Sequence, residues 1–135
     1  VEITESEALE DSETGLENLQ ILDAAGISLA LDDFGTGHSS LRYVQNLPLS
    51  TLKIDQSFIR SIDSDATKAR AILRATLELA RQLDLTVVAE GVETQSQFDW
   101  LRDRRCQVAQ GFLLARPMTA SDFQTDWLEH RLEAT

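Results

Sequence analysis

The stretch Leu31-Asp32-Asp33-Phe34-Gly35-Thr36-Gly37 decides how this chain folds, because two carboxylates and a glycine-rich turn follow an apolar run directly. That run, residues 27–31, has the composition of a strand buried on both faces of a parallel sheet. Acidic residues recur at the ends of other apolar segments, at Glu2, Asp55 and Glu90. Buried charges are costly unless they are paired or bind a metal ion. Their repetition predicts a functional site, since barrel enzymes build active sites from the carboxyl ends of their strands.

Strand and helix patterns alternate along the chain, with short connections between them. Strands are expected over residues 1–5, 27–31, 49–54 and 85–89, with a weaker one over 108–114. Helices are expected over residues 11–25, 39–47, 65–83, 94–104 and 121–132. This alternation predicts right-handed βα units and a parallel sheet. Because an eight-stranded barrel takes about 250 residues, the chain is either a small open sheet or the C-terminal half of a barrel.

Local signals place the ends and faces of these helices. Gly26 is expected to end the first helix and Ser121 to cap the last one. The helix over 94–104 is expected to turn Phe98 and Leu101 inward. The apolar stripe of the long helix is expected to comprise Ile72, Leu73, Thr76, Leu79, Ala80 and Leu83.

Composition narrows the class of protein. The chain has 135 residues, a net charge of -11, and hydrophobic and charged contents of 42% and 26%, which are typical of a soluble globular domain. This negative charge argues against binding long nucleic acid, which needs a basic surface. A small phosphate ester is compatible with it if divalent cations neutralise the carboxylates. A single cysteine, Cys106, and the lack of an evident signal peptide or membrane span favour a reducing cytoplasm, although the parent could still be membrane-anchored.

The acidic residues at the strand ends are candidates for a metal site. Folding a parallel sheet would gather Glu2, Asp32, Asp33 and Glu90 at one edge. Carboxylate ligands of this kind suit Mg²⁺ or Mn²⁺. Two such ions about 3.5–4 Å apart can clamp a phosphodiester between an attacking water and a leaving oxygen. Taken singly, each acid has a structural alternative, because Asp and Glu also cap helices and open turns.

Lys53 stands inside the apolar segment 51–55. A lysine that faces a barrel interior needs carboxylates nearby, and it could then orient or deprotonate a metal-bound water. Asp55, two residues further on the same face, is a candidate ion partner. The alternative is an edge-strand lysine that blunts aggregation.

Two further segments carry weaker signals. Residues 34–40 are rich in glycine but lack the lysine and the spacing of a nucleoside triphosphate-binding loop, and His38 is expected to be an ordinary loop residue. Gln110-Gly111-Phe112 combines an amide with an aromatic ring at a strand end, as a base-stacking site would. Core packing explains Phe112 equally well.

Taken in order, five segments carry a specific resemblance: Val1-Glu2-Ile3-Thr4-Glu5, Asp32-Asp33-Phe34-Gly35-Thr36-Gly37, Leu52-Lys53-Ile54-Asp55, Ala89-Glu90-Gly91-Val92-Glu93-Thr94 and Gln110-Gly111-Phe112. Together they resemble the later motifs of EAL domains, bacterial phosphodiesterases that open cyclic di-GMP to linear pGpG. The resemblance spans Val1 to about Phe123. It implies an α/β fold in which parallel βα units form the C-terminal half of a TIM-like (β/α)8 barrel. It also implies a two-metal mechanism with Mg²⁺ or Mn²⁺ and a cyclic dinucleotide as substrate.

The resemblance assigns catalytic roles residue by residue. Glu2 and Asp32 would hold the first metal ion, and Asp32 would bridge to the second. Asp33 and Glu90 would complete the second metal site. Lys53, together with Glu90, would carry the catalytic step by helping to activate the nucleophilic water.

The resemblance assigns supporting roles to other residues. Gln110 and Asp55 would belong to the shell of substrate and water. Glu5 would anchor the loop that contains Gly35 and Gly37, which in this family couples metal binding to dimerisation. A homodimer is therefore expected, and upstream sensor or GGDEF-type domains are compatible with the family.

The Glu-Ala-Leu strand that names the family would lie upstream of Val1, with an asparagine ligand and an arginine that grips substrate. Glu7-Ala8-Leu9 spells the signature by coincidence, because it follows the Glu2 motif in an acidic stretch. Residues 1–135 are therefore interpreted as the C-terminal portion of an EAL-type domain, inactive alone. Two alternatives remain open. One is a degenerate EAL domain acting as a cyclic di-GMP receptor or interaction module, and the other is an unrelated barrel lyase or aldolase with a Schiff base at Lys53.

Overall fold

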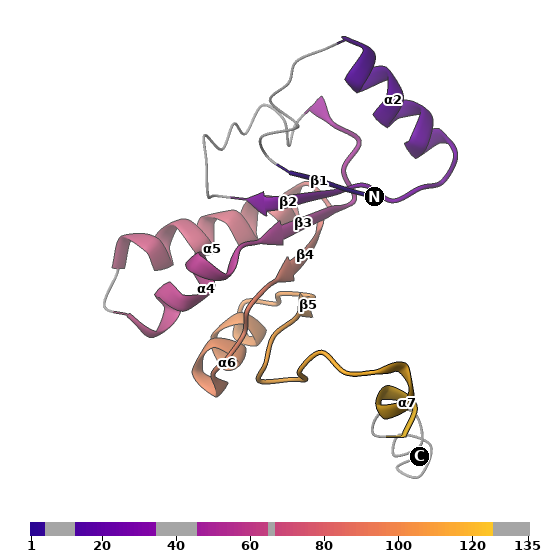
Figure 1. Ribbon diagram of the computed structural model, residues 1–135. Coiled ribbons are helices and arrows are strands. Elements are labelled where there is room, and N and C mark those ends of the chain that lie inside the picture. The colour runs from indigo at the N-terminus through magenta and orange to yellow at the C-terminus, as the bar shows by residue number, and fades with distance from the viewer. Residues whose placement is uncertain (5–12, 35–45, 65–66, 126–135) are drawn as a thin grey trace.

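A five-stranded parallel sheet forms the centre of the computed structural model, which describes residues 1–4, 13–34, 46–64 and 67–125 (Figure 1). The strands are β1 Glu2–Thr4, β2 Ala30–Phe34, β3 Thr51–Ile54, β4 Thr86–Ala89 and β5 Val108–Ala109. They pair in sequence order, each parallel to the next. Parallel neighbours in sequence order are what successive βα units produce in a barrel wall, so the predicted α/β class is confirmed.

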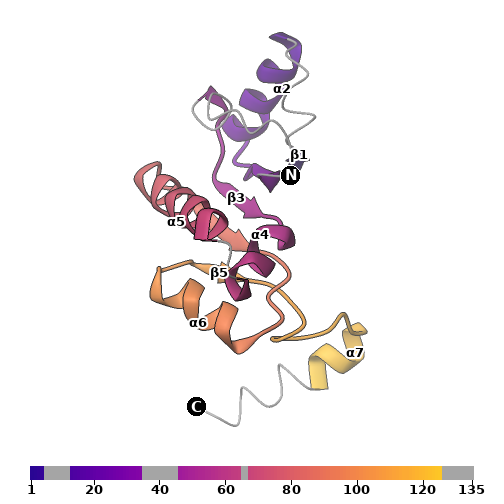
Figure 2. The ribbon, with the colours of Figure 1, turned by 90° about the vertical axis from the view of Figure 1, so that its left-hand side faces the viewer.

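Helical segments connect these strands. They are α2 Glu13–Ala24, α4 Gln56–Arg60, the short 3-10 helix η1 Ser61–Asp63, α5 Thr67–Gln82, α6 Gln95–Asp103 and α7 Ala120–Phe123. The two views show α4, α5 and α6 along the sheet, and α7 standing away from the strands (Figures 1 and 2). None of the helices in the described ranges has the length and apolar character that crossing a membrane requires.

The buried core lies between one face of the sheet and the segments α4, η1, α5 and α6. Its strand residues are each at most 1% exposed: Leu31, Leu52, Ile54, Val87 and Ala89. Its helical residues include Ile59, Ile62, Leu73, Leu77, Ala80 and Leu101. Because side chains alternate along a strand, the residues between these core positions face the other side of the sheet.

A bulge in β2 places an acidic pair between two core residues. Leu31 pairs with Leu52 and Phe34 pairs with Ile54, so β2 carries one more residue than β3 over this stretch. Asp33 takes up the extra length with a φ of 56°, in the left-handed region that aspartate tolerates better than most residues. The expectation that the strand ends at Leu31 is therefore wrong. The strand continues through the acids, and Phe34 returns to the core with 8% exposure.

Several helix expectations need correction. The buried stripe of α5 is Leu73, Leu77 and Ala80, while Ile72 is 54% exposed and Leu83 is 43% exposed. Thr119, not Ser121, caps α7, because the Thr119 side chain accepts the backbone N–H of Asp122 at 3.2 Å. Gly26 does end α2, with a φ of 77°.

The last strand is shorter than the expected residues 108–114. β5 ends at Ala109, after which the N–H groups of Leu114 and Ala115 both bond to the carbonyl of Gly111 in a turn. Only glycine fits at position 111, because a Cβ there would overlap the backbone of Val92. Residues 39–45 of the expected short helix lie outside the described residues.

Candidate active site

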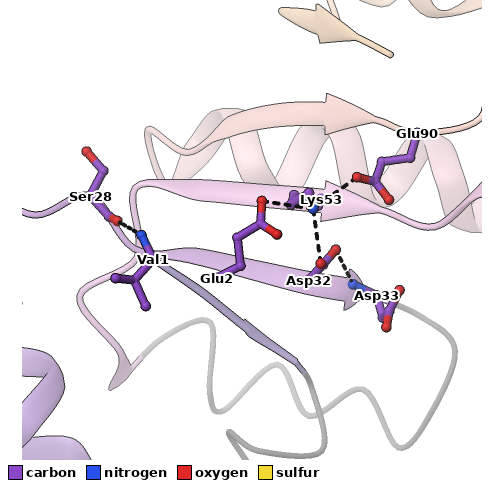
Figure 3. Close-up of polar contacts among 7 residues, drawn as sticks. All are labelled: Val1, Glu2, Ser28, Asp32, Asp33, Lys53 and Glu90. Carbon is purple, nitrogen blue, oxygen red and sulfur yellow. Dashed lines mark hydrogen bonds and ion pairs between the residues drawn. The ribbon is translucent and has the colours of Figure 1, made fainter. Parts of the chain in front are cut away.

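Three carboxylates converge on one lysine at the carboxyl end of the sheet (Figure 3). Glu2 comes from β1, Asp32 from β2 and Lys53 from β3, while Glu90 follows β4 directly. The Lys53 Nζ lies 2.9 Å from Glu2 Oε1, 3.0 Å from Asp32 Oδ2 and 3.0 Å from Glu90 Oε1. Strand pairing brings Asp32, Lys53 and Glu90 together, since β2, β3 and β4 are neighbours in the sheet. Glu2 opens β1 opposite Ala30, two residues before Asp32, and its long side chain reaches Lys53 from there. The predicted gathering of acids from separate strands therefore occurs around a cation.

The Lys53 side chain is only 13% exposed, so its charge is held away from bulk water. Burial alone would lower the pKa of Lys53, but the bonds to Glu2, Asp32 and Glu90 outweigh it and raise that pKa above its ordinary value. The ammonium is therefore protonated at neutral pH and serves as a hydrogen-bond donor. A Schiff-base lysine needs the opposite change, a lowered pKa that frees the amine, which argues against the lyase or aldolase alternative.

The carboxylates differ in how firmly they are held. The side chains of Asp32 and Glu90 are 21% and 24% exposed, whereas that of Glu2 is 59% exposed. Asp32 is also fixed from a second side, because the backbone N–H of Asp33 donates to Asp32 Oδ1 at 2.9 Å. Asp33 lies on the bulge with an exposed side chain, beyond the contact between Asp32 and Lys53 (Figure 3). The site is thus built around Asp32, Lys53 and Glu90.

The donor set fits a hard divalent cation. Within the described ranges, no group of three or more His, Cys, Asp or Glu side chains surrounds a common point as a ready metal cage. The carboxylates nevertheless already gather around a positive charge, and they offer oxygen atoms alone. Oxygen ligands of this kind are those that Mg²⁺ and Mn²⁺ prefer.

Asp55 is not the ion partner of Lys53. Its carboxylate caps α4 by accepting the backbone N–H of Ser57 at 2.8 Å. Burial would raise the pKa of Asp55, but the hydrogen bonds from Ser57 and Gln56 and the charge of Arg60 together lower it. A free acid directly after a strand and before a helix is a strong N-cap signal, which accounts for its place here.

Gln110 and the glycine-rich loop are placed only in part. Gln110 connects strand ends through its backbone, since its N–H donates to Ala89 O at 2.8 Å and its carbonyl accepts from Val92 N at 3.0 Å. Its side chain is exposed. Glu5, Gly35, Gly37 and His38 lie outside the described residues.

Cys106 is a structural residue. Its thiol bonds to the carbonyl of Val108 at 3.4 Å. Burial raises the pKa of this thiol, and the backbone hydrogen bonds offset that only partly. A raised pKa leaves little thiolate at neutral pH, which a nucleophile would need.

Sequence reasoning missed the polar network behind Glu90. Gln97 is 3% exposed and accepts the backbone N–H groups of Glu93 and Thr94 at 2.8 and 3.1 Å. The spacing Thr94-x-x-Gln97 is a capping box, which could have revealed it. Gly91, with a φ of 68°, is needed because a Cβ there would overlap the Cβ of Gln56.

A surface hollow lies apart from the carboxylates. It encloses about 410 Å³ between α5 and α6 and is lined by Arg74, Leu77, Glu78, Arg81, Asp103, Arg104, Arg105 and Gln107. Neither Lys53 nor its carboxylate partners line it, so the chemistry is not located there.

Comparison with known families decides what this arrangement is. Residues 1–117 match the model of the EAL domain. This chain belongs to the EAL domain family. Among its relatives, the bifunctional diguanylate cyclase/cyclic di-GMP phosphodiesterase MucR of Pseudomonas aeruginosa is 48% identical over 120 residues, which are 89% of this chain and 17% of MucR. The cyclic di-GMP phosphodiesterase NbdA of the same species is 39% identical over 134 residues, 99% of this chain and 17% of NbdA.

Solved EAL structures share the fold. The MucR phosphodiesterase in complex with c-di-GMP superposes with a TM-score of 0.83 at 47% identity, covering 90% of this chain and 49% of that one. The manganese/cy-diGMP complex of Klebsiella pneumoniae BlrP1 superposes with a TM-score of 0.79 at 35% identity, covering 86% of this chain and 29% of the BlrP1 chain. The chain thus spans about half of the solved MucR chain and less than a fifth of these two curated relatives. The expected likeness to part of a TIM-like barrel is confirmed.

Proposed function

We propose that these 135 residues are the C-terminal portion of an EAL domain that hydrolyses cyclic di-GMP to linear pGpG. The observation that carries the proposal is the convergence of Glu2, Asp32 and Glu90 on Lys53 from adjacent strands. A phosphodiester substrate is anionic, and this group of acids would repel it without added positive charge. The names of MucR and NbdA, which describe cyclic di-GMP phosphodiesterases, support the substrate.

Each residue of the site is proposed to have a role that follows from its position. Lys53 is protonated and would orient the water that attacks phosphorus once one of its three carboxylate acceptors turns away, because the ammonium has only three N–H donors. Asp32 aligns Lys53 from one side and Glu90 aligns it from the other. Gln110, exposed at the end of β5, is proposed to contact substrate or its water shell, while Asp55 supports the site indirectly by capping α4.

Mg²⁺ or Mn²⁺ is the proposed cofactor. Glu2 and Asp32 would contribute to one ion, and Asp32, Asp33 and Glu90 to a second. When bound, such ions neutralise substrate charge and lower the pKa of water. The solved complex of the related protein BlrP1 with manganese and cy-diGMP supports this choice of ion.

The decisive test uses the full-length protein that contains these residues. We expect it to release linear pGpG from cyclic di-GMP with Mg²⁺ or Mn²⁺, and to lose activity with Ca²⁺, which prefers more ligands at longer distances. Turnover that persists in excess chelator would contradict the metal assignment. Tight cyclic di-GMP binding without any product would instead favour the degenerate receptor.

The wider setting is proposed on the same basis. We place the domain in the cytoplasm as part of a homodimeric signalling protein that carries a sensor or GGDEF-type domain upstream. The bifunctional name of MucR supports such a combination. Sedimentation of the full-length protein would test the dimer.

A further inference from the structure

The loop that carries Glu90 is held by a side chain that the proposed mechanism does not use. The chain passes from β4 to α6 through residues 90–94. Gln97, in the first turn of α6, is 3% exposed. Its Oε1 accepts the backbone N–H of Glu93 at 2.8 Å and that of Thr94 at 3.1 Å. One amide oxygen therefore fixes the far end of the loop.

The nitrogen of the same amide reaches a different part of the chain. Gln97 Nε2 donates to Asp63 Oδ2 at 2.8 Å, and Thr94 Oγ1 donates to that oxygen at 2.9 Å. Asp63 lies in η1, which follows α4 and therefore the end of the strand that carries Lys53. The elements bearing Lys53 and Glu90 are thus joined twice, through the β3–β4 pairing and through Asp63.

The loop between these anchors has little room to move. Gly91 packs against Gln56 so closely that no Cβ would fit. Val92 is fully buried, and its N–H donates to the carbonyl of Gln110 at 3.0 Å. The N–H of Glu90 itself donates to Ile54 O at 3.1 Å. Glu90 is therefore connected to Gln97 through a short, packed segment whose path depends on the anchors at both of its ends.

We propose that Gln97 and Asp63 are positioning residues that hold the Glu90 carboxylate in its place beside Lys53. The inference rests on the proposed function, in which Glu90 works at the reacting centre. Glutamine suits the position because its amide accepts two N–H groups at one end and donates to a carboxylate at the other. A carboxylate at position 97 would face Asp63 with like charge, and an apolar side chain would leave two N–H groups without an acceptor.

The test compares Gln97→Glu, Asp63→Asn and the double variant in the full-length protein. The matched control is Gln95→Glu, because Gln95 Nε2 also donates to an aspartate, Asp99, but does so on the exposed surface of the same helix turn. We expect Gln97→Glu to lower kcat about tenfold or more, with little change in KM, since small misplacements of reacting groups are costly. We also expect weaker Mn²⁺ binding, measured by calorimetry without substrate. The double variant restores a donor–acceptor pair between the two positions and should recover most of both losses.

The outcomes separate positioning from folding and from function. Unchanged kcat and Mn²⁺ affinity in Gln97→Glu would overturn the proposal, and so would a double variant that recovers its melting temperature but not kcat. If Gln97→Glu does not fold, Asp63→Ala decides, because Asp63 is exposed in η1. A several-fold lower kcat at an unchanged melting temperature supports positioning, and wild-type kcat overturns it. If the unsubstituted protein hydrolyses nothing, the proposed function fails, while the Mn²⁺ affinities still test the positioning.

Discussion

Lys53 makes it possible for several acids to share one edge of the sheet. Each carboxylate alone would have to lose water next to other negative charges, which is unfavourable. The ammonium lies within 3.0 Å of all three, so the group forms a compact cluster with one positive charge. The cluster still has a negative excess, which is the condition that attracts divalent cations.

Replacing Lys53 should show how far the stability of the protein depends on its pairing with the carboxylates. Lys53→Met is expected to lower the free energy of unfolding by about 2 kcal/mol, because it leaves partly buried carboxylates without their partner. Arg102→Met is the control, since Arg102 and its partner Asp99 are 62% and 41% exposed. Arg102→Met should lower the free energy of unfolding by less than about 0.5 kcal/mol. Urea denaturation of the full-length protein measures both, and equal costs would show that Lys53 is no better paired than a surface arginine.

The adjacent acids should differ in their effect on catalysis. Asp32 contacts Lys53 and accepts the N–H of Asp33, whereas the Asp33 side chain is exposed. Asp32→Asn is therefore expected to reduce kcat at least tenfold more than Asp33→Asn, at matched metal concentration. Steady-state hydrolysis of cyclic di-GMP measures both variants. Equal residual activities would contradict the central place given to Asp32.

At the scale of elements, the sequence predicted the order of strands and long helices because their apolar patterns are local. It also predicted the meeting of Asp32 and Glu90, since parallel strands end at one edge. Glu2 joins them although it opens β1, because its side chain is long enough to reach Lys53. It failed at Asp55, where helix capping competes with ion pairing and wins. It failed at β5 because the constraint on Gly111 comes from Val92, which is distant in sequence and close only after folding.

Two glycines offer a matched test of that long-range constraint. Gly111→Ala should destabilise the protein by about 2–3 kcal/mol, because its Cβ would overlap backbone that cannot rotate away. Gly26→Ala should cost about 1 kcal/mol, because its site is open and only the positive φ is unfavourable. Thermal unfolding of the two variants measures the difference. A larger cost at Gly26 would mean that the loop next to Val92 adapts easily.

At the scale of the whole molecule, the sheet formed by the described residues is open on both sides. β1 and β5 are its edges, and the apolar residues near β5 are exposed, including Val108, Phe112 and Leu114 at 43%, 54% and 39%. Open edges and exposed apolar side chains both favour association. A barrel would cover them with further strands.

The isolated chain of 135 residues is therefore expected to self-associate and to hydrolyse cyclic di-GMP poorly. Light scattering at micromolar concentration should show dimers or larger species, because pairing buries edges and apolar faces together. Co-expression with the segment that precedes these residues in the full-length protein is the control and should give a defined species. A sharp monomer peak with cooperative melting and full activity would contradict this expectation.

The bulge at Asp33 has a consequence for how much chemistry one strand can display. A regular strand sends every second side chain to the same face, so two core anchors on that face leave room for a single residue between them. β2 anchors Leu31 and Phe34 in the core and still fits two acids in the interval. The left-handed backbone at Asp33 accommodates the extra residue, so the strand gains one more functional position while Leu31 and Phe34 stay in the core. Deleting Asp33 would restore regular alternation, so Phe34 would stay on the core face opposite Ile54 and the strand would lose only its extra functional position.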